Sequence, residues 1–154
     1  MVPDHIGWTL WQATLAWRRD FVAAMAEAGH GWFAQARGNL LVYIGPKGIR
    51  QGDLAEKAGL TKQAVQQFVD DLVQDGIVMR VPDDSDARAR LVRLTPAGEA
   101  AMQDADRIKL QIETRWKAVL GEDGFARLDS ALRQVIAETS ASALPAKSQS
   151  GKKD

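Results

Sequence analysis

Three residues in the middle of the chain, Ala55, Gly59 and Val65, limit its fold more than any other feature, through their type and their spacing. Two helices can cross closely where one carries a small side chain. A turn can take the left-handed conformation at a glycine, and a branched apolar residue can anchor the helix that follows. These residues meet the three requirements in that order. The segment therefore predicts a helix-turn-helix, with helices at roughly 51–58 and 62–75.

The second of these helices has two unlike faces. Its expected inner face is apolar at helical spacing and consists of Val65, Phe68, Val69, Leu72 and Val73. The first two turns of its outer face carry no acidic residue; with the expected N-cap they hold Thr61, Lys62, Gln63, Gln66 and Gln67. A glutamine amide matches the major-groove edge of adenine, and a lysine and a helix N-terminus suit phosphate. We take these five residues as candidate DNA contacts; the alternative is a solvated helix surface that is merely rich in glutamine.

A β-hairpin is predicted after the second helix. Residues 77–81 and 91–95 are short runs rich in β-branched residues, and the polar stretch 82–90 between them suits a long, exposed tip. Arg88 and Arg90 would then lie on a ribbon beside the helix-turn-helix. From such a ribbon an arginine can enter a minor groove.

The charges of this region do not favour DNA as a whole. Residues 60–95 hold five basic and six acidic side chains, so DNA binding would depend on where each charge lies. Asp86 is interpreted as orienting an arginine of the hairpin through a charge-assisted hydrogen bond. A solvated acidic turn is the simpler interpretation of Asp83 and Asp84.

Long helices are predicted on both sides of this region. Apolar residues follow helical spacing from 6 to 28 over more than half of the helix circumference, and a second helix is expected at 32–44. After the hairpin, Thr95 caps and Pro96 opens a helix to about residue 120, and a last helix follows Gly121. Because a helix with so wide an apolar face usually packs on two sides, a second copy of the chain is the expected partner.

These elements predict a mainly α fold with a small β-hairpin, in which a winged helix-turn-helix domain is flanked by N- and C-terminal dimerisation helices. We expect a single folded chain over 1–139, with the DNA-binding region at 32–96 and the dimerisation helices at 6–31 and 97–139. Residues 140–154 are rich in Ser, Ala, Lys and Gly and cannot bury a core, so a disordered tail is predicted.

Composition excludes several kinds of chemistry. The 154 residues include no cysteine, so disulfides, thiolate metal sites and a nucleophilic thiol are excluded. His5 and His30 are the only histidines, and the sequence has no catalytic triad arrangement, phosphate-binding glycine loop or HExxH motif. We therefore expect no metal, no cofactor and no enzymatic activity. No apolar stretch reaches the roughly 18 residues of a membrane span and no signal peptide is evident, so we expect a cytoplasmic protein without membrane contact.

A combined pattern runs from about residue 40 to residue 98. It consists of Leu54-Ala55, Gly59-Leu60-Thr61-Lys62, Val65, Leu72, Gly76-Ile77-Val78, Asp86-Ala87-Arg88 and Val92-Arg93-Leu94-Thr95-Pro96-Ala97-Gly98. In this pattern the chain resembles the multiple antibiotic resistance regulators, the MarR family. The resemblance implies that the N-terminal and last two helices form a dimer interface, that the helix from Lys62 enters the major groove, and that Arg88 reaches the minor groove. Two positions depart from the family: Asp84 stands where proline is frequent, and Ala87 where a second basic residue is common.

Four of the five tryptophans lie in the first two predicted helices: Trp8, Trp11, Trp17 and Trp32. Core packing or dimer contacts would explain most of them. In the resembled family, however, these helices also help to form a cavity for small aromatic effectors. We therefore consider an effector site near Trp8, Trp11, Trp32 and Arg37, in which the arginine would pair with a carboxylate of the effector.

Together these features predict a sequence-specific DNA-binding regulator of transcription. We expect a homodimeric repressor that occupies a pseudo-palindromic operator in double-stranded DNA and is released by a small aromatic effector. The alternative is a winged-helix module that binds a protein instead of DNA, and the acidic hairpin is the feature that favours it.

Overall fold

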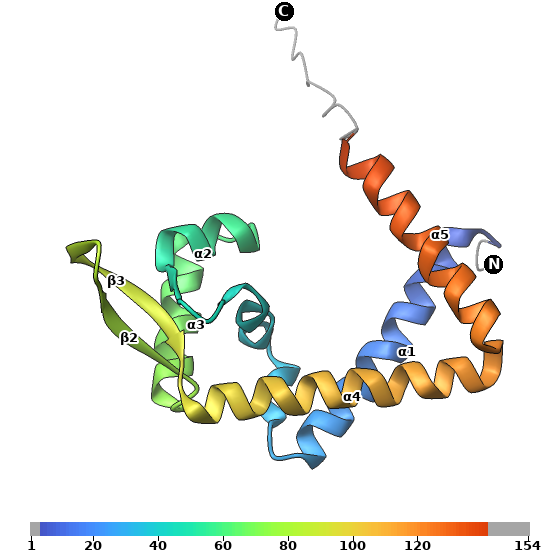
Figure 1. Ribbon diagram of the computed structural model, residues 1–154, viewed down its shortest axis with the longest axis horizontal. Helices are drawn as coiled ribbons and strands as arrows, with labels where there is room; N and C mark the ends of the chain where they lie inside the picture. Colours follow the sequence, from blue (N-terminus) through green and yellow to red (C-terminus); the bar gives the residue numbers. More distant parts are fainter. Residues whose placement is uncertain (1–3, 142–154) are drawn as a thin grey trace, which may run out of the picture. The chain divides into compact units, whose positions relative to one another are not determined.

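The computed structural model describes residues 4–141, and Figure 1 shows the order of its elements. Their bounds are α1 Ile6–Glu27, the 3-10 helices η1 Gly31–Ala34 and η2 Ala36–Tyr43, β1 Ile49–Arg50, α2 Gln51–Ala58, α3 Lys62–Gln74, β2 Val78–Asp83, β3 Asp86–Leu94, α4 Pro96–Leu120 and α5 Glu122–Ala141. The chain forms two compact units, with the boundary after Ile112 in α4. The mainly helical fold with a small antiparallel sheet confirms the predicted fold class.

The predicted helix-turn-helix is present as α2 and α3. α2 ends at Gly59, whose φ of 64° lies in the left-handed region, and the N–H of Leu60 donates to the carbonyl of Ala55 at 3.0 Å. Glycine adopts this conformation without the steric strain that a Cβ would cause. The hydroxyl of Thr61 then accepts a hydrogen bond from the N–H of Ala64 at 3.1 Å and so caps α3. Ala55 is buried, as the close crossing of the two helices requires.

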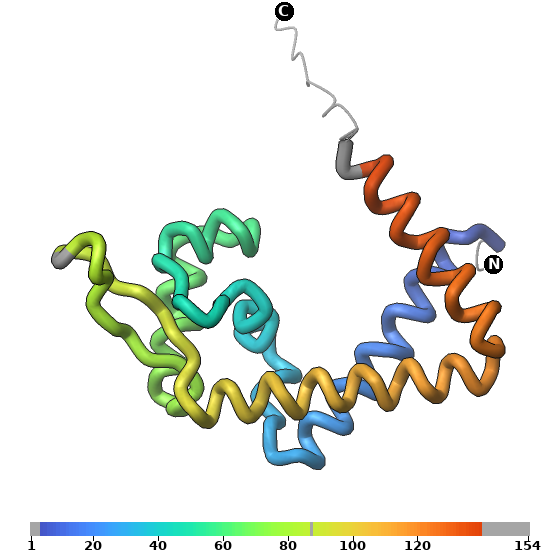
Figure 2. Tube along the Cα trace, viewed as in Figure 1, coloured from blue at the N-terminus to red at the C-terminus, as the bar shows by residue number. Residues whose placement is uncertain are grey.

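The sheet is larger than predicted. It has three antiparallel strands in the order β1-β3-β2, and the strand that the sequence did not predict, β1, pairs Ile49 with Val92. β2 extends to Asp83 and β3 begins at Asp86, so the predicted long tip at 82–90 is wrong and a short turn at Asp84 and Ser85 takes its place. Figure 2 shows the resulting narrow hairpin projecting beyond α3.

The segment between α1 and β1 also differs from its prediction. A single helix was expected at 32–44, but η1 and η2 are two short 3-10 helices separated at Gln35, whose ψ of 155° is extended. The backbone of Gly38 packs directly on Phe33: a Cβ on this glycine would lie 3.0 Å from the Cα of Phe33. Phe33 is held in turn by stacking on Trp32 at 4.3 Å and by an edge contact with Phe21 at 5.8 Å. The extended backbone at Gln35 thus interrupts the expected single helix, and Phe33 packs on α1 through Phe21.

The first unit has a continuous apolar core. The side chains that are most fully buried in it are Met25, Leu40, Leu41, Leu54, Val65, Val69, Leu72, Val78, Val92, Ala101, Ala105 and Ile112. α4 begins very close to the sheet, because a Cβ at Gly98 would clash with the carbonyl oxygen of Ile77. Thr95 caps this end of α4 by accepting a hydrogen bond from the N–H of Gly98 at 3.1 Å. The helix-turn-helix and the hairpin are therefore mounted on one packed body.

Both ends of the described chain carry apolar side chains that a single copy leaves exposed. In α1, Ile6 is 73 % and Trp11 55 % exposed. In the second unit, Val119 is 84 % and Ile136 62 % exposed, and no residue from 122 to 139 in α5 is buried. Contiguous exposed apolar surface is typical of sites that contact another molecule. None of the described helices combines the length and apolarity that a membrane span requires.

Candidate nucleic-acid interface

The outer face of α3 presents the residues that the sequence singled out. Lys62 is the first residue of the helix, no acidic side chain lies in the first turn, and Lys62, Gln63, Gln66 and Gln67 are all exposed. The first N–H groups of a helix have no partner within it and carry a partial positive charge. This end of α3 can therefore attract a phosphate, while the glutamines that follow lie on the solvent-facing surface.

One of these glutamines belongs to a chain of polar contacts that the sequence did not predict. The side-chain oxygen of Gln66 accepts a hydrogen bond from Nε2 of Gln51 at 2.6 Å, and its nitrogen donates to both carboxylate oxygens of Asp70 at 2.9 and 3.0 Å. Arg80 of β2 forms an ion pair with the same carboxylate at 2.5 Å. The hydrogen bond from Gln66, followed by that from Arg80, lowers the pKa of Asp70 below its ordinary value. The spacing of Gln66 and Asp70 on one helix could have indicated their contact, but nothing local links either to Gln51 or Arg80.

The acidic residues at the end of α3 also have basic or amide partners. Arg37 of η2 lies 2.9 Å from a carboxylate oxygen of Asp75 and 3.8 Å from one of Asp71. Asp71 in addition accepts a hydrogen bond from Gln67 at 2.9 Å. The guanidinium of Arg37 is largely buried, and its Nε has no hydrogen-bond partner among the described residues. Arg37 thus holds the C-terminal end of the helix that carries the candidate DNA contacts.

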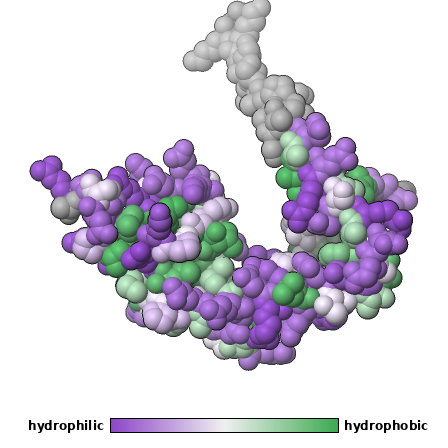
Figure 3. Space-filling model, viewed as in Figure 1, coloured by the Kyte–Doolittle hydropathy of each residue, from purple (hydrophilic) through white to green (hydrophobic). Residues whose placement is uncertain are grey.

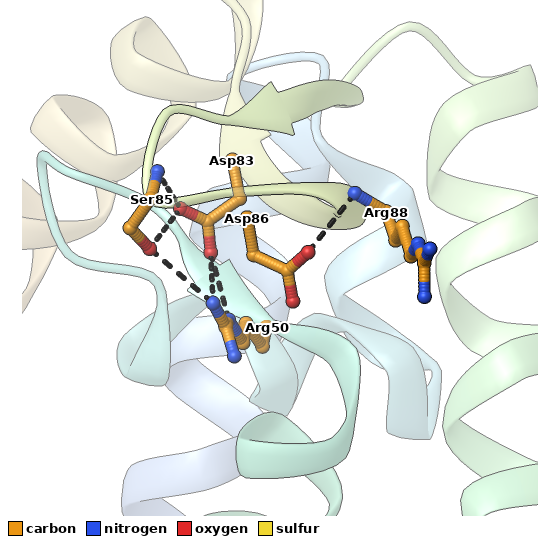
Figure 4. A network of polar contacts seen from close by, with 5 residues as sticks. All are labelled: Arg50, Asp83, Ser85, Asp86 and Arg88. Carbon is orange, nitrogen blue, oxygen red and sulfur yellow. Dashed lines mark hydrogen bonds and ion pairs between the residues drawn. The ribbon is translucent and has the colours of Figure 1, made fainter.

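A second network closes the turn of the hairpin (Figure 4). Asp83 is 8 % exposed, and its carboxylate accepts hydrogen bonds from the hydroxyl of Ser85 at 2.7 Å and the N–H of Ser85 at 2.9 Å. Arg50, which immediately precedes α2, forms an ion pair with Asp83 at 2.6 Å. The hydrogen bonds from Ser85, and then that from Arg50, lower the pKa of Asp83 to about 2. The interpretation of Asp83 as part of a solvated turn is therefore wrong, because its partners draw it into the sheet.

Asp86 and Arg88 interact differently from the expectation. The carboxylate of Asp86 accepts a hydrogen bond from the backbone N–H of Arg88 at 3.0 Å. Figure 4 shows the guanidinium of Arg88 pointing away from the carboxylate of Asp86. Arg88 and Arg90 both lie on β3 rather than in a loose tip, and both are exposed. Asp86 thus shapes the backbone of the hairpin and leaves the side chain of Arg88 unrestrained.

The pairing of charges changes the electrostatic character of this surface. Of the six acidic residues between 60 and 95, those bound to an arginine are Asp70, Asp71, Asp75 and Asp83. In contrast, no ion pair of Lys62, Arg88 or Arg90 is found within residues 4–141. In the view of Figure 3, hydrophilic side chains cover the outer edge of the part that holds α2 and the hairpin, with apolar side chains visible between them. Most of the acids of this region therefore act as internal braces, and the cations that remain unpaired lie on its surface.

The residues considered for an effector site are not brought together within one chain. Trp32 and Arg37 line the same open hollow, whose volume is about 560 Å³, together with Gln35 and Asp75. Trp8 and Trp11 lie in the first turns of α1, which has 22 residues, and so at the end of this helix that is far from Trp32. At 1.5 Å per residue, Trp11 is roughly 24 Å from the end of α1 at which Trp32 is found.

A second cavity, smaller than the hollow beside Trp32 and Arg37, lies between α1, the 3-10 helices and α4 and was not predicted from the sequence. Its volume is about 150 Å³, and its walls are formed mainly by the apolar residues Trp17, Phe21, Val22, Phe33, Val42, Met102 and Ala105. Arg18 and Lys109 also line it and supply two positive charges. Trp17 stacks on Phe21 at 5.1 Å, so part of the tryptophan cluster forms a wall of this cavity.

A helix-turn-helix followed by a β-hairpin that packs on the same core defines the winged helix-turn-helix class. Residues 36–89 match the family model described as the MarR family. This match and the fold shared with solved regulators support a MarR-family winged-helix regulator, as the resemblance predicted. No curated protein matches the sequence significantly.

Solved structures of regulators share the fold. A probable transcriptional regulator from Pseudomonas aeruginosa is 26% identical, with a TM-score of 0.66, over 86% of this chain and 98% of its own. The transcriptional repressor CouR, bound to a 23-mer DNA duplex, is 25% identical, with a TM-score of 0.67, over 86% of this chain and 92% of its own. A cysteine-to-serine mutant of MarR from E. coli, complexed with operator DNA, is 22% identical, with a TM-score of 0.68, over 85% of this chain and 93% of its own.

Proposed function

We propose that the protein is a sequence-specific DNA-binding repressor of transcription that acts as a homodimer. In this proposal α3 enters the major groove, where Gln63, Gln66 and Gln67 read base edges, and the β2–β3 hairpin lies along the backbone with Arg88 directed to the minor groove. The observation that carries the proposal is the distribution of charge. The acids bordering the interface are mostly bound to arginines, whereas Lys62, Arg88 and Arg90 are exposed without an ion pair among the described residues. The DNA-bound state of CouR supports this assignment.

The homodimer is proposed from the apolar surface at the chain ends. The exposed side chains of α1 and of the second unit, among them Trp11, Val119 and Ile136, would be covered by a second copy. A two-fold dimer presents its two recognition helices about one turn of DNA apart, which fits a pseudo-palindromic operator. Binding to such an operator within a promoter would repress transcription by excluding other proteins.

Release by a small aromatic carboxylate is proposed for the hollow beside Trp32 and Arg37. An effector carboxylate there would compete with Asp75 for the guanidinium of Arg37, and would so loosen the contact that holds the end of α3. Trp8 and Trp11 would join this site only from a second copy of the chain. An effector releases DNA only to the extent that it binds the DNA-incompatible state more tightly, so operator must weaken effector binding by the same factor. Titration of benzoates followed by tryptophan fluorescence, with and without operator, tests this reciprocity.

The decisive test of DNA binding is selection of bound duplexes from random double-stranded DNA by the purified full-length protein. Recovery of a sequence with two-fold symmetry supports the proposal. Binding constants for that sequence and for an unrelated duplex, measured across a salt series, then separate specific from non-specific binding. If no sequence is enriched and retention on DNA does not depend on salt, the protein-binding alternative replaces the proposal.

A further inference from the structure

The side chain of Gln66 is oriented by neighbours from three different elements. Arg80 of β2 holds the carboxylate of Asp70, Asp70 accepts from the amide nitrogen of Gln66, and the amide oxygen of Gln66 accepts from Gln51. Gln51 is the first residue of α2, and it precedes Gln66 by 15 positions. The row of contacts therefore crosses from the hairpin, over the outer face of α3, to the first helix of the helix-turn-helix.

The negative charge of Asp70, which Arg80 pairs, determines the direction of the contacts that follow in this row. An ionised carboxylate can only accept hydrogen bonds, so Asp70 requires the nitrogen of the Gln66 amide, not its oxygen. The oxygen of Gln66 is then directed to Gln51, which must in turn present its own nitrogen, since two amide oxygens would repel each other. The alternative orientation of the Gln66 amide would place its oxygen against the carboxylate of Asp70 and its nitrogen against the amide nitrogen of Gln51. Its orientation is thus set before any DNA is bound.

An amide held in this way retains one hydrogen-bonding site of each kind. A glutamine amide has two N–H donors and two acceptor lone pairs. One donor of Gln66 is used by Asp70 and one lone pair by Gln51, which leaves one donor and one lone pair on an exposed side chain. Adenine presents one acceptor, N7, and one donor, the N6 amino group, in the major groove. The remaining sites of Gln66 match this edge in number and kind.

We propose that Gln51 is a specificity-determining residue that acts through Gln66: it holds the Gln66 amide in the orientation that reads adenine. The proposal deepens the proposed function and rests on it. Gln51 is a positioning residue here, since its own side chain contacts Gln66 and not the base. Because the Gln66 amide is already oriented, its binding to adenine does not require a free side chain to be ordered. Loss of Gln51 therefore lowers the preference for adenine at one base pair of each half-site, and not the affinity for DNA in general.

The test compares Gln51→Met with Gln66→Met and with the control Gln74→Met. Methionine has nearly the size of glutamine, favours helices and lacks the amide donor. Gln74, the last residue of α3, is an exposed glutamine outside the row and receives the same change. The full-length variants are titrated by fluorescence anisotropy with the selected operator and with duplexes in which each A·T pair of a half-site is replaced by G·C in turn. The quantity compared is the affinity ratio between operator and substituted duplex.

Gln66→Met is expected to reduce this ratio by about 5- to 150-fold at one base pair, the usual range for a bidentate base contact. Gln51→Met is expected to reduce the ratio at the same base pair, with unchanged salt dependence and thermal stability, and the double variant is expected to lose no more than Gln66→Met alone. Gln74→Met leaves the ratio unchanged.

A charged variant adds a second readout. Gln51→Glu replaces the donor by acceptors, so the Gln66 amide is faced by carboxylates on both sides and the adenine preference is lost. A glutamate in the first turn of α2 favours the helix, so thermal stability does not fall. The proposal is overturned if Gln51→Met retains the full ratio while Gln66→Met loses it, or if Gln51→Met weakens binding to all duplexes equally, which would indicate a phosphate contact. It is also overturned if Gln66→Met changes no base preference, although DNA binding itself then stands. Absence of sequence-specific binding by the unchanged protein refutes the proposed function as well.

Discussion

Removal of Arg88 should change the salt dependence of DNA binding by an amount that follows from the structure. Three cations per chain that we assign to contacts with DNA, Lys62, Arg88 and Arg90, are exposed and without an ion pair among the described residues. A dimer presents twice this number. With about 0.9 counterions released per neutralised phosphate, the logarithm of the binding constant should fall with the logarithm of salt concentration at a slope of about −5.4. Arg88→Ala removes one third of these contacts, so its slope should be about −3.6.

The difference is large enough to measure by titration. Between 50 and 200 mM salt the affinity of the unchanged protein should fall about 2,000-fold, and that of Arg88→Ala only about 150-fold. Fluorescence anisotropy with the selected operator at four or five salt concentrations gives both slopes. Arg107→Ala is the control, because Arg107 is bound to Asp104 at 2.7 Å on α4 and is not assigned to the interface. Equal slopes for Arg88→Ala and the unchanged protein would refute the placement of Arg88 against DNA, and a slope near zero for the unchanged protein would refute the interface as a whole.

Three further predictions address the hairpin, the dimer and the operator. The pKa of Asp83 is lowered to about 2 from an ordinary 3.8, so the ionised carboxylate stabilises the folded hairpin fully above about pH 4, and this stabilisation is lost as the pH falls toward 2. Hydrogen exchange of the hairpin amides should become faster over this pH range in the unchanged protein, beyond any change seen in Asp83→Asn. Val119→Glu combined with Ile136→Glu should give folded monomers, since both side chains are exposed in a single chain, and a dimer of this variant in sedimentation would contradict the proposed interface. Footprinting should show half-sites centred roughly 10 to 11 base pairs apart, and a single asymmetric footprint would count against a two-fold dimer.

The helix-turn-helix was predictable because its determinants are local. Gly59 alone supplies the left-handed residue of the turn, and Thr61 caps a helix that begins at the next residue. The apolar face of α3 can be predicted without knowing what it packs against, because its period of 3.6 residues is visible in the sequence itself. Prediction succeeded where each residue acts on neighbours only a few positions away.

The hairpin and the segment after α1 were not predictable in this way. Asp83 looked like a residue of an open turn, yet its ion pair with Arg50 spans 33 positions and closes that turn. Gly38 was counted within a single helix, although its packing on Phe33 accompanies a break at Gln35 that the sequence pattern did not indicate. The contact of Gln51 with Gln66 likewise joins two elements whose register is set by the core between them. Sequence patterns identify which side chains are polar, but the fold decides whether they face water or one another.

The same distinction explains how a chain with 20 basic and 20 acidic residues can present a surface suited to DNA. A net charge of zero would exclude such a surface only if the charges were mixed evenly over the molecule. Here Asp70 and Asp83 each bind an arginine and an adjacent polar side chain, so their charge is largely cancelled within a few ångströms. Each pair also braces an element that, in the proposed function, meets DNA in a defined position: α3 in one case and the hairpin in the other. Conversion of both acids to asparagine would make the surface more positive, yet it would release Gln66 and the hairpin turn. Non-specific affinity should therefore rise while discrimination between operator and unrelated DNA falls, which is the opposite of what a simple count of charges predicts.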